Sequence, residues 1–233
     1  MSQFTGFPKA GLRFLKELEA NNNREWFEAH KQDYLDTVRD PAVAFVGALG
    51  ERLKSISGDI VYDTRTNGGG SLLRIYRDVR FSRDKAPYKT NIGIIFWEGS
   101  AKKIENPGFY FHLDSSSAWL HGGLHMFPKP FLDIYREALD DKKLGSKLEA
   151  ALEAVKSAGE YQVGGEQYKR VPQGYDKDHP RADLLRYKGL GASTRPLNRS
   201  LLSKPELVDV CFEHCQNIAP LQQWFVRVIQ GAR

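Results

Sequence analysis

GFYFHLDSSSAWLHGGL, residues 108–124, decides the fold class, because two runs of alternating polar and apolar residues flank a short polar turn. The runs Gly108 to Leu113 and Ala118 to Leu124 have the two-residue period of a half-buried β-strand. A turn of two or four residues at positions 114–117 places His112 opposite Trp119. The sequence therefore predicts an antiparallel hairpin.

The predicted hairpin has an apolar face and an aromatic polar face. The apolar face is expected in the core and consists of Phe109, Phe111, Leu113, Ala118 and Leu120. The other face carries side chains with hydrogen-bonding atoms, namely Tyr110, His112, Trp119 and His121. Two interpretations stay open: these side chains bind a ligand, with His112 as a proton-transfer group, or they pack beneath helices and satisfy one another.

Further strands and helices surround the hairpin. Runs of β-branched and aromatic residues predict strands at Ile60 to Tyr62, Leu72 to Phe81 and Ile92 to Trp97, the last inside the sheet because both its faces are apolar. Helical spacing predicts helices near 12–18, 24–38, 41–53, 130–139, 144–155, 180–188 and 207–228, with irregular chain at 159–175. Because the strands are grouped between helices, we predict an α+β fold, an antiparallel meander of about five strands covered by N-terminal and C-terminal helices.

Composition places the chain among ordinary globular proteins. It has 233 residues, of which 41% are hydrophobic, and no repeat or Pro/Ser-rich linker divides it, so we predict one domain over residues 1–233. The N-terminal residues lack the apolar core of a signal peptide, and the longest apolar run is too short to span a bilayer. We therefore expect a cytoplasmic protein with no membrane partner. Cys211 and Cys215, the only cysteines, are expected to be reduced thiols.

Positive charge is concentrated in RIYRDVRFSRDKAPYK, residues 74–89. Six basic and two acidic residues give this segment a charge of 6 − 2 = +4, out of a chain total of +5. As a strand, the segment puts Arg77 on its apolar face, where the guanidinium must reach water, pair with an acid or bind a ligand. Asp78 and Asp84 neutralise only two of the six cations, so the segment predicts a site for an anion.

We expect a phosphate-bearing or other anionic small molecule to be the partner of this segment. Arginine binds phosphate and carboxylate in a bidentate manner, and Pro87 stiffens the loop that follows the predicted strand. The expected ligand-binding residues are Arg74, Arg77, Arg80, Lys85, Tyr88 and Lys89. If the protein is an enzyme, which the sequence leaves open, His112 and Asp84 are the candidates for proton transfer.

Two alternatives use the same cations differently. In the first, the protein is a nucleic-acid-binding module whose arginines contact phosphates while Tyr110 and Trp119 stack on bases. In the second, the arginines are structural and form internal salt bridges with acids such as Glu25, Glu28 and Asp33. A nucleic-acid-binding module is expected to show binding that depends strongly on salt. If the arginines are structural, Arg77→Ala is expected mainly to lower the melting temperature.

Other motifs indicate no metal site and identify no cofactor. The glycines at 68–70 precede neither a P-loop lysine nor a helix, which favours a flexible turn over a phosphate cradle. Asp176, Asp178 and His179 fit turn and capping roles before Pro180, and the three histidines His112, His121 and His125 have no recognised ligand spacing. Signatures of serine hydrolases, zincins and dinucleotide-binding folds are absent from the sequence.

The basic segment also resembles a known family. RDVRFSRDKAPYK looks like the signature of the bacterial and fungal family called domain of unknown function 2461. Three further segments carry the resemblance over nearly the whole chain: NNNREWFEAHKQDY at 21–34, PGFYFHLD at 107–114 and RVPQGYDKDHPRADLLRYKG at 170–189. The resemblance implies no reaction, substrate or cofactor.

Overall fold

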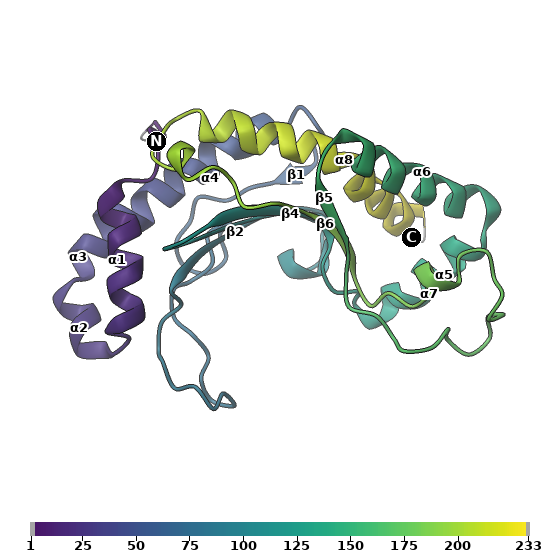
Figure 1. Cartoon of the computed structure of the whole chain (residues 1–233), viewed down its shortest axis with the longest axis horizontal. Helices are drawn as coiled ribbons and strands as arrows, with labels where there is room; N and C mark the ends of the chain where they lie inside the picture. The colour runs from purple at the N-terminus through teal and green to yellow at the C-terminus, as the bar shows by residue number, and fades with distance from the viewer. Residues whose placement is uncertain (1–2, 232–233) are drawn as a thin grey trace. The chain divides into compact units, whose positions relative to one another are not determined.

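The computed structural model describes residues 3–231, and its α+β architecture confirms the predicted fold class (Figure 1). The helices are α1 (Lys9–Ala20), α2 (Arg24–Ala29), α3 (Lys31–Tyr34), α4 (Asp40–Leu53), α5 (Lys129–Asp140), α6 (Lys142–Ala158), α7 (Ala182–Leu185) and α8 (Leu207–Gly231). The strands are β1 (Ile60–Val61), β2 (Asn91–Glu98), β3 (Gly108–Asp114), β4 (Ala118–Leu124), β5 (Tyr161–Gly164) and β6 (Leu190–Thr194).

The strands form a six-stranded antiparallel sheet in the order β1-β2-β3-β4-β6-β5. The hairpin that the sequence predicted joins β3 to β4, and the Asp114 N–H donates to the Ser117 carbonyl at 2.9 Å. This two-residue turn gives the predicted register, and the His112 ring stacks on Trp119 with centroids 4.8 Å apart. Strand β2 lies inside the sheet as predicted, next to the very short edge strand β1.

The chain forms two compact units, and the prediction of a single domain stays a prediction. The first unit contains residues 3–96, 110–120 and 196–213. Its core is an aromatic cluster in which Phe45 of α4 contacts Phe111 of β3, with ring centroids 4.6 Å apart, and Phe7 stacks on the same ring at 6.0 Å. Helix α2 begins as predicted, because the Asn23 side chain accepts a hydrogen bond from the Trp26 N–H.

The second unit contains residues 97–109, 121–195 and 214–231. Helices α5, α6 and the later part of α8 supply its core around the fully buried Tyr135, whose ring lies 4.4 Å from that of Phe127. The Trp224 indole of α8 donates to the Leu144 carbonyl of α6 at 2.9 Å. Helix α8 continues through Pro220 as one helix, in agreement with the helix predicted near 207–228. Cys211 and Cys215 are free and buried, as expected for reduced thiols.

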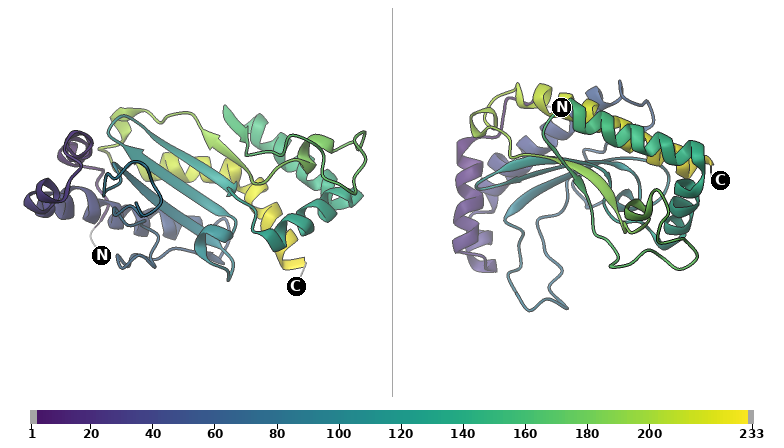
Figure 2. Two further views of the ribbon diagram at one scale, coloured as in Figure 1. Left: turned by 90° about the horizontal axis from the view of Figure 1, so that it is seen from below. Right: turned by 45° about the vertical axis from the view of Figure 1, so that its right-hand side comes forward.

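Three expected elements differ from the structure. Residues 72–81 do not form a strand: Leu72 makes a single bridge to Ile94, and the chain then leaves the sheet as an irregular loop (Figures 1 and 2). The helix predicted over 24–38 is interrupted at His30 and ends in a π-helical turn at Leu35–Arg39, which runs directly into α4. Strand β5 lies within 159–175, predicted as irregular chain, and it extends the sheet together with β6, which no prediction covered.

None of the helices within residues 3–231 combines the length and the apolar composition that crossing a membrane requires.

Candidate functional site

The basic segment forms a loop that pairs with itself instead of with the sheet. The Arg77 N–H donates to the Pro87 carbonyl at 2.9 Å, and the Lys89 N–H donates to the Ile75 carbonyl at 2.7 Å. Between these bonds, Tyr76 and Tyr88 form an isolated antiparallel bridge. The two arms of the loop therefore meet in a short, hydrogen-bonded base, and the residues between them form its tip.

Tyr88 fixes this base to the N-terminal helices. Its side chain is only 3% exposed, and its ring stacks on Phe27 of α2 with centroids 4.0 Å apart. The side chain of Asn22 also holds the backbone of Tyr88. The Asn22 amide nitrogen donates to the Tyr88 carbonyl at 3.0 Å, and the Asn22 amide oxygen accepts from the Tyr88 N–H at 3.1 Å. Tyr88 was predicted as a ligand-binding residue, and the structure places its side chain mainly in the packing of the loop base.

Two of the six cations are neutralised by the two aspartates of the loop itself. Arg77 lies 2.5 Å from Asp84 and also donates to the Ala86 carbonyl at 3.1 Å, while Arg80 lies 2.7 Å from Asp78. Arg77 thus pairs, which is one of the three outcomes expected of an arginine with apolar neighbours. Within residues 3–231 no ion pair joins these arginines to the helix acids that the structural alternative named.

The remaining four cations have no acidic partner within residues 3–231. No carboxylate within the described residues pairs with Arg74, Arg83 or Lys89, and the Lys85 ammonium donates only to the Val79 carbonyl, at 3.0 Å. Lys89 is half-buried, and its burial, with the nearby charge of Arg74, lowers the pKa of the ammonium. A desolvated cation without a counter-ion is the feature expected of an anion site.

Lys89 lines an open cleft of about 480 Å³ beside the loop base. The cleft is lined by Glu19, Asn22, Arg77, Asp84, Ala86, Tyr88, Lys89, Thr90 and Asn91. A second cleft of about 350 Å³ shares Arg77 and Tyr88 and is completed by Arg24, Glu28, Tyr76, Val79 and Pro87. The structure thus brings together three of the six predicted ligand-binding residues, while Arg74, Arg80 and Lys85 line neither cleft.

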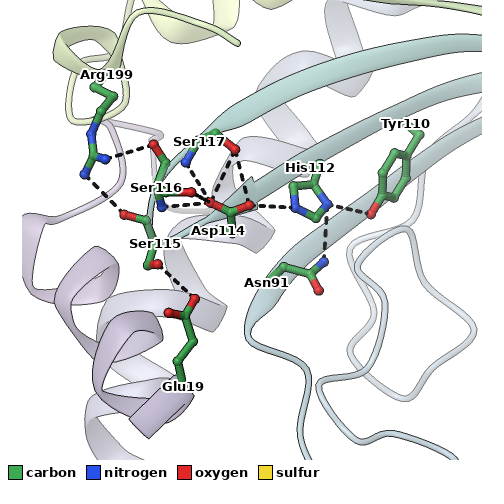
Figure 3. A network of polar contacts seen from close by, with 9 residues as sticks. All are labelled: Glu19, Asn91, Tyr110, His112, Asp114, Ser115, Ser116, Ser117 and Arg199. Atoms are coloured by element: carbon green, nitrogen blue, oxygen red, sulfur yellow. Dashed lines mark hydrogen bonds and ion pairs between the residues drawn. The ribbon is translucent and has the colours of Figure 1, made fainter.

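Next to the cleft, His112 lies in a chain of hydrogen bonds (Figure 3). Its Nε2 is 3.2 Å from Asp114 Oδ2, and its Nδ1 is 3.2 Å from the Tyr110 hydroxyl and 3.5 Å from the Asn91 amide nitrogen. Because a carboxylate only accepts, Nε2 carries the proton in the neutral ring and Nδ1 accepts. Asn91 belongs to both the cleft and this network, so His112 lies one residue away from the cleft.

Asp114 orients His112 and also closes the hairpin turn. Burial alone would raise its pKa, but the Ser116 hydroxyl and the Ser116 and Ser117 amides, with a smaller contribution from His112, lower it to about 2. Arg199 donates to the Ser115 and Ser116 carbonyls of the same turn, and Ser115 donates to Glu19 of α1 (Figure 3). The ionised carboxylate is therefore part of the native structure.

The variant Asp114→Asn is expected to lower the free energy of unfolding by about 1–2 kcal/mol at neutral pH, because it weakens charge-assisted hydrogen bonds. The folded-state pKa of Asp114 lies below its ordinary value of 3.8, so this stabilisation is complete above about pH 4 and disappears as the pH falls toward 2. Urea unfolding at neutral pH and near pH 3 measures both effects. Asp133→Asn, which changes an exposed carboxylate, is the control, and an equal effect of both variants contradicts the prediction.

Asp84, the second candidate for proton transfer, is a weak base in this structure. The Ala86 N–H and then the Arg77 guanidinium hold the pKa of its carboxyl below the ordinary value. His112 is the better candidate, since its ring accepts and donates in the same network.

The described residues contain no cluster of three or more His, Cys, Asp or Glu side chains suited to a metal ion.

Sequence reasoning missed the polar residues that complete the site. Asn22 was not predicted as a site residue, although its side chain holds the loop base. Asn91, Thr90 and Glu19 line the cleft but belong to no recognised motif. The one available signal for Asn22 is its position within NNNREWFEAHKQDY, a segment that carries the family resemblance.

Comparison with known proteins agrees with the resemblance. The family described as conserved hypothetical protein, DUF2461, matches residues 10–224. The match includes all the residues of the loop, the clefts and the His112 network, and it confirms the resemblance inferred from the four motifs. Among the curated proteins compared with the chain, none matches.

Proposed function

We propose that this chain, which belongs to the DUF2461 family, binds an anionic small molecule bearing a phosphate group in the cleft beside the loop base. The observation that carries the proposal is Lys89, a half-buried ammonium with no acidic partner among residues 3–231. Charges are rarely buried without compensation, so the ligand supplies the missing negative charge. An anion bound there would also remove the repulsion between Lys89 and Arg74.

The other lining groups narrow the chemistry of the ligand. The amides of Asn22 and Asn91 and the Thr90 hydroxyl are neutral donors that suit phosphate oxygens. Glu19 and Asp84 line the same cleft as carboxylates, and they disfavour a ligand that is anionic over its whole length. We therefore favour a ligand with one phosphate group at Lys89 and hydroxyl or amine donors facing the acids, such as a sugar monophosphate.

If the bound ligand reacts, His112 is our candidate for the proton-transfer group. Asn91 bridges the cleft to Nδ1 of His112, and Asp114 fixes the ring through Nε2. His112 acts on a ligand only if the Asn91 amide turns away from the ring, which the 3.5 Å separation between their nitrogens permits at little cost. The anion-binding proposal does not depend on this step.

The variant Lys89→Met is expected to weaken binding of glucose 6-phosphate or inorganic phosphate at least tenfold, because a charge-assisted hydrogen bond contributes about 1.5–3 kcal/mol. Methionine keeps the length of the stem without its charge, so the fold should persist. Isothermal titration calorimetry measures the affinity, and Lys16→Met, at an exposed lysine of α1, is the control. Absence of binding by both anions, or equal affinity of the wild type and Lys89→Met, overturns the proposal.

A further inference from the structure

The tip of the loop carries an aromatic side chain in full contact with solvent. Phe81 is 95% exposed, and Tyr76, which belongs to the loop base, is 54% exposed. Most large aromatic side chains of a folded protein are largely covered, so an isolated phenyl ring at a loop tip is unusual. The exposed ring does not take part in the core or in either cleft.

The hydrogen bonds of the loop hold this tip in a defined position. The Lys85 ammonium and the Ser82 N–H each bond the Val79 carbonyl, and Arg77 bridges to Asp84 and Ala86 across the two arms. At its base the loop is fixed to α2, because the Tyr88 ring stacks on Phe27. The loop that carries Phe81 is therefore already ordered, which reduces the conformational entropy lost when a partner binds.

The surroundings of Phe81 are strongly basic. Residues 77–85 contain Arg77, Arg80, Arg83 and Lys85 against Asp78 and Asp84, a local charge of 4 − 2 = +2, and Arg80 is paired with Asp78. The Arg80 guanidinium lies 5.9 Å from the centre of the Phe81 ring, and Arg83 has no acidic partner among the described residues. The natural partner of such a surface is negatively charged and has flat apolar groups.

We propose that the Phe81 tip, with Arg80, Arg83 and Lys85, is a contact site for single-stranded nucleic acid. Single strands are bound by cations that follow the phosphates and by aromatic rings on which the unpaired bases stack. A duplex keeps its bases stacked on one another and offers no free base face to the ring. A bilayer is a poorer fit, because the tip presents a single phenyl ring between charged residues, and stable membrane attachment takes more apolar surface than one ring supplies.

Phe81 is more available for stacking than Tyr110 and Trp119, which the sequence suggested for contact with bases. Tyr110 and Trp119 are only partly exposed, and their rings contact each other at 5.4 Å, while Trp119 also stacks on His112. One face of the Trp119 ring is thus covered by His112 within the hairpin. The proposal is independent of the anion cleft, because Phe81, Arg80, Arg83 and Lys85 line neither cleft.

Two substitutions of Phe81 separate stacking from simple apolar contact. Phe81→Tyr keeps a stacking ring and is expected to bind a fluorescent single-stranded oligonucleotide of about 12 residues within threefold of the wild type. Phe81→Leu keeps apolar surface but no ring, and it is expected to bind roughly five- to 100-fold more weakly by fluorescence anisotropy. Ile104→Ala, at another exposed apolar residue, is the matched control and should bind as the wild type does.

A salt titration tests the cations of the tip. Between about 50 and 200 mM NaCl the logarithm of the affinity should fall linearly, and Arg83→Gln should reduce that slope by about 1. Equal affinity of the Leu and Tyr variants overturns the proposal, as does an unchanged slope in Arg83→Gln. Binding of the wild type to phosphatidylserine vesicles with no binding to the oligonucleotide at low salt also overturns it.

Discussion

Replacing Tyr88 by alanine is expected to lower the free energy of unfolding by about 3–5 kcal/mol, the usual cost of removing a buried aromatic ring. The ring is 3% exposed and fills the space between Phe27, at 4.0 Å, and Tyr76, at 5.4 Å. Alanine leaves a cavity at this point and uncovers one face of Phe27. Urea unfolding followed by circular dichroism measures the change.

Tyr88→Phe is the matched control, because it keeps the ring and removes only the hydroxyl. Within residues 3–231 that hydroxyl makes no hydrogen bond, so we expect a change of less than about 1 kcal/mol. The alanine variant should also be cut faster by trypsin at Arg80 and Arg83, since a loosened base lets the loop open more often. A loss of less than about 1 kcal/mol in Tyr88→Ala, with unchanged cleavage, contradicts the idea that Tyr88 fixes the loop.

The strands that depend on local pattern could be predicted closely. Residues 108–113 and 118–124 alternate regularly, and the polar tetrapeptide between them allows only a few turn lengths. The register followed from the two-residue turn and was correct, with His112 stacked on Trp119. For a strand pair joined by so short a turn, the information needed is contained in consecutive residues.

The elements that depend on distant partners could not be predicted in the same way. Residues 72–81 have the alternation of a strand, yet only Leu72 bridges to β2, because the segment finds its partner in the returning arm of its own loop. Strands β5 and β6 are short and contain Gly164 and Gly191, which carry no side chain and weaken the strand signal. Their pairing connects residues about 30 positions apart, which no local pattern reveals.

In the candidate site, too, the features set by local sequence could be predicted and those set by distant residues could not. The excess of positive charge could be read from the composition of residues 74–89, and the count of two aspartates correctly anticipated that two of the six cations would be paired. Which cation lies half-buried in a cleft depends on Asn22 and the helices beside the loop, so Lys89 could not be distinguished from Lys85 by sequence. Burial, and not charge alone, selects the residue on which the proposed function depends.

The stability of the protein is expected to fall by about 2–3 kcal/mol between pH 6.5 and pH 4 because of His121. Burial, and then the charge of His125, lowers the pKa of its ring to about 4, while the unfolded chain titrates near 6.5. The unfolded state therefore binds the proton first. The stabilisation is complete above about pH 6.5 and is lost as the pH falls toward 4.

The packing around His121 explains why the ring stays neutral. Its Nδ1 lies 2.9 Å from the Ser193 hydroxyl of β6, and Nε2 has no hydrogen-bond partner among the described residues. A Cβ on Gly191 would lie 2.3 Å from Nε2, so the backbone of β6 packs closely against this buried edge of the ring. A proton added there would create a buried charge without a partner, which is the costly case.

Urea unfolding of wild type and His121→Gln at several pH values between 7 and 4 measures this dependence. The variant should be less stable at pH 7 but should lose little further stability on acidification, whereas His125→Gln, at an exposed histidine, should keep most of the wild-type slope. Parallel curves for wild type and His121→Gln would refute the assignment. The pH range in which His121 changes stability lies above that of Asp114, whose stabilisation is lost only between about pH 4 and 2. Stability is therefore expected to fall in two successive steps on acidification, the first caused by His121 and the second by Asp114.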